Sequence, residues 1–214
     1  MTGPHSSSVR EPGRRERNKA DKRRRIEAAA RELFSTRGYS SVTTQEVARL
    51  ADVGTGTLFR YAQSKGELLC MVAKEDVRAM FDTVPDTGDP VEDLLVLCEP
   101  LVTALTRQPE NVVAYHRETL FGDPGPHRSE ALRILAGLRG VIAAVLARHS
   151  GLDADSPALA GPAQTVFDVL YMEIVRGGIE SEEGRDHRTE LRGHVHRVLR
   201  GALPAASADP DAAP

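Results

Sequence analysis

Residues 43–65 read TTQEVARLADVGTGTLFRYAQSK, and this stretch decides the fold. Thr43 and Glu46 form a capping box, in which each side chain can bond to the other residue's backbone N–H. We therefore expect a short helix over residues 43–51, with small apolar residues on one face. Residues 52–54 (DVG) predict a tight turn, and residues 55–62 predict a second short helix.

Two short helices joined by a turn of three or four residues are the signature of a helix-turn-helix. In that motif the second helix enters the major groove of DNA and the first crosses the backbone. Here the second helix opens with Gly54-Thr55-Gly56-Thr57, whose small side chains let the backbone approach the bases. Threonine hydroxyls can bond to bases or phosphates, and threonine methyls can touch a thymine methyl. Arg60, Tyr61 and Lys65 are placed to reach phosphates, which fix position rather than sequence choice.

Outward from this stretch, helical spacing of apolar residues predicts an all-α protein of about nine helices. The first helix is expected over 21–36, ending at Gly38. Ser64 and Glu67 form a second capping box, which opens a fourth, longer helix that ends before Pro85. Further helices are expected over 90–105, 109–121, 128–149 and 186–203. The helix that ends near residue 179 has two possible starts, Pro157 and Pro162, because a proline inside a helix removes a hydrogen bond.

Charge is divided unevenly along the 214 residues. Residues 1–65 carry 14 Lys and Arg against 7 Asp and Glu, a balance of +7, whereas the remainder carries 14 against 24, a balance of −10. Only the N-terminal part is therefore expected to meet a polyanion. We divide the chain into a disordered basic arm (1–18), a three-helix DNA-binding domain (19–65), a helical bundle for ligand binding and dimerisation (66–203) and a disordered tail (204–214).

Several classes of function receive no support from the sequence. Cys70 and Cys98 lack metal-ligand or redox spacing, and the histidines offer no chelating pair, so no metal or cofactor is expected. No nucleophile–base pair or phosphate loop is present, so no catalytic residue is assigned. No run approaches the roughly 18 apolar residues of a membrane span, and the N-terminus does not fit a signal peptide. We expect a cytoplasmic protein that is not an enzyme and has no membrane partner.

Four spaced motifs carry a family resemblance: Phe34-x-x-Arg37-Gly38-Tyr39, Thr43-Thr44-x-x-Val47-Ala48, Ala51-x-Val53-x-x-Gly56-Thr57-Leu58-Phe59-x-Tyr61, and Ser64-Lys65-x-Glu67-Leu68-Leu69. Together they resemble the TetR/AcrR family of bacterial repressors over about 45 residues. The resemblance implies a homodimer with an N-terminal DNA-binding domain and a helical regulatory domain. The resulting DNA-binding candidates are Thr43, Thr44, Gly54, Thr55, Gly56, Thr57, Phe59, Arg60, Tyr61 and Lys65.

Three positions depart from the family pattern. The family usually has glycine at position 52, tyrosine at 59 and an aromatic residue at 62, where this chain has Asp52, Phe59 and Ala62. Phe59 lacks the hydroxyl that would bond to phosphate, and Ala62 would thin the packing between the third and fourth helices. The basic cluster Arg23, Arg24 and Arg25 has two interpretations, a DNA contact or a solvated surface.

The second half of the chain yields weaker candidates. The resemblance implies an effector pocket, and the scarcity of inward charges predicts an apolar or aromatic effector. Candidate lining residues are Met71, Met80, Leu101, Leu105, Tyr115, His116, Phe121, Phe167 and Tyr171. The helix ending near residue 179 is apolar nearly all round and, with the last helix, matches the dimerising pair of the family. Candidate interface residues are Phe167, Leu170, Tyr171, Leu191, Val195 and Val198.

These features predict a sequence-specific DNA-binding regulator, most simply a repressor that a small molecule releases from its double-stranded operator. An activator, or a regulator without any effector, would carry the same features. A helical small-molecule enzyme is the remaining alternative and has no motif in its favour.

Overall fold

The computed structural model describes residues 13–81, 85–180 and 186–202, and within them it contains nine α-helices and no strand. The predicted all-α class is thereby confirmed. The helices are α1 (Arg14–Arg37), α2 (Thr44–Leu50), α3 (Thr55–Leu58), α4 (Lys65–Ala79), α5 (Pro90–Arg107), α6 (Pro109–Phe121), α7 (Pro126–Ser150), α8 (Pro157–Ile179) and α9 (His187–Ala202).

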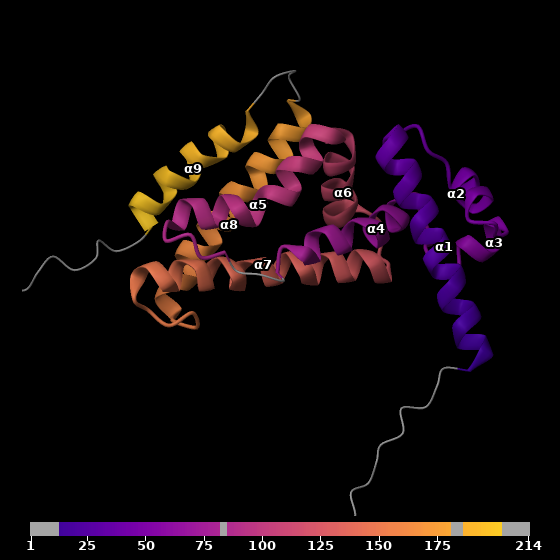
Figure 1. Cartoon of the computed structure of the whole chain (residues 1–214), viewed down its shortest axis with the longest axis horizontal. Coiled ribbons are helices and arrows are strands. Elements are labelled where there is room, and N and C mark those ends of the chain that lie inside the picture. Colours follow the sequence, from indigo (N-terminus) through magenta and orange to yellow (C-terminus); the bar gives the residue numbers. More distant parts are fainter. Residues whose placement is uncertain (1–12, 82–84, 181–185, 203–214) are drawn as a thin grey trace, which may run out of the picture.

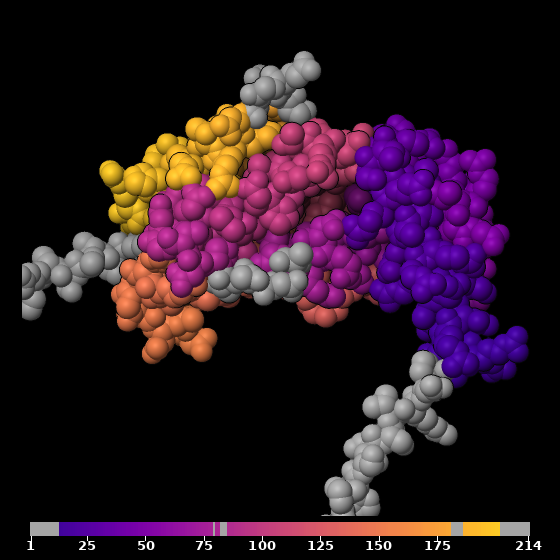
Figure 2. Space-filling view, in the orientation of Figure 1, coloured from indigo at the N-terminus to yellow at the C-terminus, as the bar shows by residue number. Residues whose placement is uncertain are grey.

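Helices α1–α3 gather at one end of the molecule, where they form the indigo lobe of Figure 2. The lobe closes around apolar residues that are almost fully buried, among them Ile26, Phe34, Val47 and Leu58. Three helices of this size bury little surface alone. The fourth helix therefore supplies much of their support.

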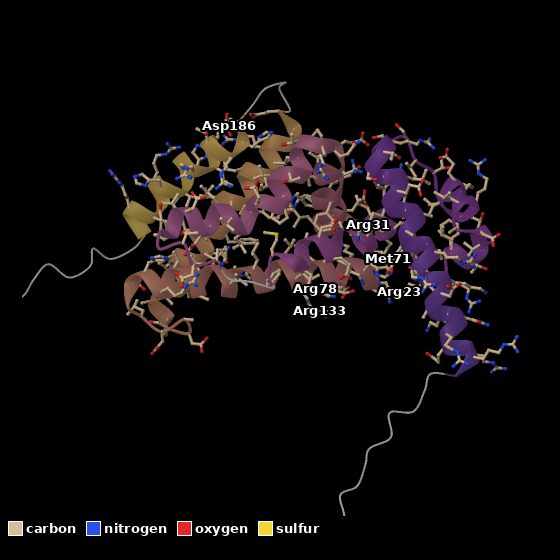
Figure 3. The ribbon with its side chains drawn as sticks, viewed as in Figure 1. Arg23, Arg31, Met71, Arg78, Arg133 and Asp186 are labelled. Carbon is tan, nitrogen blue, oxygen red and sulfur yellow. The ribbon has the colours of Figure 1, made fainter. Side chains whose placement is uncertain are left out.

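Helix α4 leaves the lobe and enters the bundle, packing against α1, α6 and α7. Arg31 of α1 fixes this packing, because its guanidinium donates to the Asp76 carboxylate at 2.9 Å and to the Val72 carbonyl at 2.7 Å. Met71, labelled with Arg31 in Figure 3, is 1% exposed on α4. One contiguous apolar core runs from Ile26 in α1 to Leu199 in α9. The lobe and the bundle are consequently coupled through shared packing.

The bundle consists of α4–α9. Helix α7 lies along α4 and α8, α6 packs on α8, and α9 covers α5 and α8 (Figure 1). Asp89 caps α5 by accepting from the Val91 N–H at 2.9 Å, as its Asp-Pro sequence predicts. Helix α8 begins at Pro157 and retains Pro162 in its interior, which resolves the choice between the two starts.

Two helix boundaries differ from the prediction by more than two residues. Helix α1 begins at Arg14 rather than residue 21, so the part of the basic arm from residue 14 is helical. Its first turns lack an apolar stripe but are rich in good helix formers, and the Arg23–Glu27 pair at 2.9 Å adds support further along the helix. The rest of the arm, residues 1–12, and the tail from residue 203 lie outside the described residues.

Helix α3 ends at Leu58, earlier than the predicted residue 62. The chain keeps winding as turns, because the N–H groups of Arg60 and Tyr61 bond to carbonyls three residues back rather than four. The Ala62 N–H again bonds four residues back, to Leu58. The difference is thus a tightening of the last turn, which is common at helix ends.

Candidate nucleic-acid interface and buried cavity

The capping box at the start of α2 is complete. The Thr43 hydroxyl accepts from the Glu46 N–H at 3.2 Å, and the Glu46 carboxylate accepts from the Thr43 N–H at 2.8 Å. Hydrogen bonds from Arg37 and Thr43 lower the pKa of Glu46 to about 2. The Thr43 hydroxyl is therefore bonded within the chain. Among the described residues, the Thr44 hydroxyl beside it is bonded only to the Gln45 side chain, at 3.2 Å.

The turn between α2 and α3 explains the first departure from the family pattern. Asp52 has φ 51°, in the left-handed region where glycine is favoured. Arg25 supports the turn by donating to the Asp52 carbonyl at 3.3 Å and pairing with its carboxylate at 3.0 Å. Arg25, for which the sequence allows a DNA contact or a solvated surface, thus bonds to the turn between α2 and α3 in this structure.

Helix α3 presents an open surface of small residues. Leu58 is fully buried and fixes the helix on the lobe, while Phe59 is 40% exposed and Arg60 is exposed. A Cβ added to Gly54 or Gly56 would meet no atom within 4 Å. Both glycines have ordinary negative φ, so neither the fold nor the packing requires glycine there. Inside a helix, as at position 56, glycine costs roughly 1 kcal/mol relative to alanine, whereas Gly54 is the N-cap of α3, where glycine is well tolerated. Among the described residues, no contact accounts for the glycine at position 56.

Two of the predicted phosphate contacts are turned toward the protein. The Lys65 ammonium donates to the Ser40 carbonyl at 3.2 Å and lies 4.3 Å from the centroid of the Tyr39 ring. Burial lowers the pKa of Lys65. The Tyr61 hydroxyl donates to the Lys19 carbonyl of α1 at 3.3 Å. Phosphate binding by these two residues stays a prediction.

The remaining basic candidates lie on α1, where Figure 3 labels Arg23. The side chain of Arg24 is 78% exposed and that of Arg23 is 46% exposed. They pair within the helix with Asp21 and Glu27 respectively. Exposed pairs of this kind contribute at most about 1 kcal/mol, so either arginine can exchange its partner for a phosphate.

Glu67 has a role that the sequence did not reveal. Ser64 caps α4 as predicted, accepting from the Glu67 N–H at 3.1 Å. The Glu67 carboxylate does not complete the predicted second capping box. It accepts instead from the Arg128 N–H at 2.8 Å and the His127 N–H at 3.3 Å, and thereby caps α7 from a site where it is only 4% exposed. A local sequence pattern cannot reveal that Glu67 bonds to His127 and Arg128, because these residues lie about 60 positions away in the sequence.

Helix α6 connects the bundle to the lobe. The Asn111 amide donates to the Phe34 carbonyl at 2.8 Å, and the Gln108 amide donates to the Ser35 carbonyl at 3.0 Å. The Glu118 carboxylate accepts from the Tyr39 hydroxyl at 3.2 Å. Glu110 accepts from the Ser40 backbone N–H, which lowers the pKa of that carboxyl. None of these residues was a sequence candidate, because only the fold brings them against α1 and the following loop.

A cavity of about 20 Å³ lies inside the bundle, between α4, α5, α6, α7 and α8. His116 of α6 is 4% exposed there, and neither nitrogen of its ring has a hydrogen-bond partner among the described residues. Its ring centroid lies 4.6 Å from that of Tyr171 on α8, whose hydroxyl also lacks a partner. Burial lowers the pKa of His116 to about 4, so the imidazole is neutral at pH 7.

Six predicted ligand residues line the cavity: Met80, Leu101, Tyr115, His116, Phe167 and Tyr171. The other three predicted residues lie elsewhere. Helical spacing marks apolar positions, but it does not show which part of the core contains a cavity. Met71 is packed in solid core, Leu105 belongs to a separate small apolar cluster, and Phe121 is 82% exposed at the end of α6. The lining residues that the sequence missed are Val77, Cys98, Leu135, Leu138, Leu170 and Ile174.

The dimer candidates divide in a similar way. Leu170, Leu191 and Val195 are at most 3% exposed within one chain, so they are core residues and cannot face a partner. Phe167, Tyr171 and Val198 are partly exposed. The outward apolar residues of α8 are Met172, 58% exposed, and Ile179, 67% exposed. An all-round apolar helix has an inner and an outer stripe, and the sequence candidates came mainly from the inner one.

In residues 13–81, 85–180 and 186–202, no three His, Cys, Asp or Glu side chains gather as metal ligands would. No helix of the described chain is long and apolar enough to cross a membrane. Both cysteines are free and buried, and burial raises the pKa of Cys70 to about 11 and that of Cys98 to about 12.

The segment from the middle of α1 to the first turns of α4 matches a known family model. Residues 26–70 match the model of bacterial regulatory proteins of the tetR family. These residues form the tetR-family region of the chain. Among curated proteins, the HTH-type transcriptional repressor KstR of Rhodococcus jostii is 31% identical over 109 residues, which cover 48% of this chain and 50% of that protein. The chain thus spans about half the length of that relative.

Solved structures extend the likeness to the bundle. Thermus thermophilus FadR, a TetR family transcriptional repressor in complex with lauroyl-CoA, is 29% identical with a TM-score of 0.62, over 88% of this chain and 98% of that one. BioQ with its double-stranded DNA operator has a TM-score of 0.58 at 21% identity, over 83% of this chain and 98% of that one. The latter likeness concerns the fold alone.

Proposed function

We propose that this TetR family chain is a DNA-binding transcriptional repressor whose α3 enters the major groove of its operator. One observation carries the proposal: α3 presents Gly54 and Gly56 with open space around them, on a helix-turn-helix that matches the family model. Thr55 and Thr57 flank Gly56 and are only partly buried, so they supply the hydroxyl and methyl groups for base contacts. Thr44, Arg60 and the arginines of α1 supply phosphate contacts.

A small molecule that binds inside the bundle would release the operator. The cavity lies beside α6, which carries His116 on the cavity side and Asn111 and Glu118 against the lobe. A ligand that widens the cavity shifts α6, and with it the lobe. Such a ligand weakens DNA binding only as far as it prefers the shifted state. The relative FadR of Thermus thermophilus is described in complex with lauroyl-CoA, which supports an effector with a largely apolar part.

Release by a lobe shift requires two copies of the chain. In a dimer, two α3 helices reach successive major-groove faces when they lie one helical turn apart, about 34–36 Å. We place the dimer interface on the outer faces of α8 and α9, where Met172 and Ile179 are exposed and Val198 is half-buried. The same role fits a regulator and not an enzyme, and the curated relative that the chain matches is named as a repressor.

A gel shift on the promoter DNA beside the chain's own gene tests this function. We expect a shift that weakens with salt and is lost on a scrambled copy of the same DNA. Thr57→Val should change the preferred sequence, whereas Arg24→Ala should weaken binding to all sequences alike. Transcript levels in a deletion strain then separate repression from activation. Absence of any sequence-selective shift would contradict the proposal.

A further inference from the structure

We propose that the cavity binds the neutral, apolar part of an effector that carries one hydrogen-bonding group, a hydroxyl or a carbonyl, paired with the His116 imidazole and the Tyr171 hydroxyl. This inference rests on the proposed function for its biological meaning, since it names the chemistry of the effector at that same site. Its physical basis is independent of DNA.

The unpartnered His116 ring is the first observation. The side chain is 4% exposed, it lines the cavity, and in the part of the chain that the structure describes both Nδ1 and Nε2 lack a partner. Buried polar groups in proteins are almost always hydrogen-bonded, because leaving one unpaired forfeits its hydration without compensation. A ligand group that bonds to the imidazole recovers that free energy. The ring is therefore poised for a partner from outside the chain.

Tyr171 supplies the second polar group on the opposite helix. Its hydroxyl is buried and has no partner within residues 13–81, 85–180 and 186–202, and its ring stands edge-on to His116 with 4.6 Å between centroids. A neutral imidazole offers one donor and one acceptor, and a phenol offers a donor and an acceptor. A ligand hydroxyl or carbonyl between α6 and α8 can satisfy both residues at once.

The rest of the lining selects against ions. The twelve lining residues include no Lys, Arg, Asp or Glu. A carboxylate placed there would lose its hydration without gaining a cation, which costs far more than burying a hydroxyl. Aromatic and aliphatic side chains, including Phe167 stacked 5.6 Å from Tyr171, suit a flat or chain-like apolar body.

The cavity must widen to admit such a body. At about 20 Å³ it has room for roughly one water molecule, whereas ligand sites occupy about 300–1,000 Å³. Met80, which has three rotatable bonds, lines it and can be displaced at low cost. Widening is also the step by which a ligand would move α6.

Three matched probes test the inference on the full chain without DNA: 2-naphthol, naphthalene and 2-naphthoate, measured by isothermal titration. They share one ring system and differ in offering a hydroxyl, no polar group or a carboxylate. We expect 2-naphthol to bind at least tenfold more tightly than naphthalene, and 2-naphthoate to bind more weakly than either. Equal binding of the first two, tightest binding of the anion, or binding of none would overturn the proposal.

Two variants locate the preference. His116→Leu should abolish the advantage of 2-naphthol, with His196→Leu, an exposed histidine of α9, as the matched control that retains it. Tyr171→Phe removes one oxygen and should reduce the advantage even if His116→Leu fails to fold. Retention of the full advantage in Tyr171→Phe and His116→Leu would contradict the assignment. Because no DNA is present, these outcomes are separable from failure of operator binding.

Discussion

The His127 imidazole donates a hydrogen bond from Nε2 to the backbone carbonyl of Tyr61 over 2.9 Å, and so joins the first turn of α7 to the chain directly behind α3. A carbonyl can only accept, which fixes the proton on Nε2. Glu67 caps the same turn of α7 through two backbone N–H groups. Helix α3 is thereby anchored to a helix that also lines the cavity.

The first prediction concerns that anchor. His127→Phe leaves the Tyr61 carbonyl without its partner, at a cost of about 1–3 kcal/mol. We expect backbone amides of residues 59–62 to exchange hydrogen roughly tenfold faster than in the wild type, because local opening becomes cheaper. His196→Phe, on the exposed face of α9, is the control. Unchanged amide hydrogen exchange of these residues in His127→Phe would show that α7 does not stabilise the end of α3.

The second prediction concerns the left-handed residue in the turn. Asp52 at φ 51° is strained relative to glycine, and alanine there would cost roughly 1 kcal/mol more than glycine. The Asp52 side chain is 95% exposed, so its ion pair with Arg25 adds little to the free energy of unfolding. We expect urea unfolding to rank Asp52→Gly as at least as stable as the wild type and Asp52→Ala as less stable. The opposite order would mean that the ion pair dominates over backbone strain.

Local features of this protein could be predicted from its sequence, whereas contacts between distant residues could not. The helix-turn-helix followed from local signals, since Thr43, Glu46 and the residues 52–54 act within a few residues of each other. Glu67 was misread because its true partners, His127 and Arg128, are distant in sequence and adjacent only after folding. Phe121 was placed in the pocket because helical spacing marks an apolar face but not where that face ends. Leu170 is an interface candidate from the sequence, and it lines the cavity instead, for the same reason.

The third prediction concerns acid. Burial lowers the pKa of His116 from its ordinary 6.5 to about 4, so below pH 6.5 the unfolded chain binds a proton that the native chain refuses. Stability contributed by this group is full above pH 6.5 and falls as the pH drops toward 4. Between pH 7.5 and pH 5 the wild type should lose about 2 kcal/mol more unfolding free energy than His116→Leu. Urea titrations at the two pH values measure these free energies. An equal loss of unfolding free energy in the wild type and in His116→Leu would refute the burial of an unpaired neutral imidazole.

The fourth prediction separates folding from DNA recognition at one atom. Gly56→Ala adds a Cβ into open space and improves helix propensity, so unfolding free energy should rise by about 0.5–1 kcal/mol. The same methyl would stand between α3 and the bases, and operator affinity should fall at least tenfold. Thermal unfolding and fluorescence anisotropy with labelled operator measure the two effects. A stabilised variant with undiminished affinity would remove the reason for glycine at this site.

The most direct test of a DNA-reading α3 is to select fragments of the source genome bound by the full chain, then compare its affinity for the enriched sequence and for a scrambled copy at one salt concentration. A specific regulator prefers its own site by roughly 10³-fold or more. We expect that ratio for the wild type and its collapse, or a changed preferred sequence, for Thr57→Val. Equal affinity for the enriched and scrambled sequences would contradict the assignment of α3 as a reading helix.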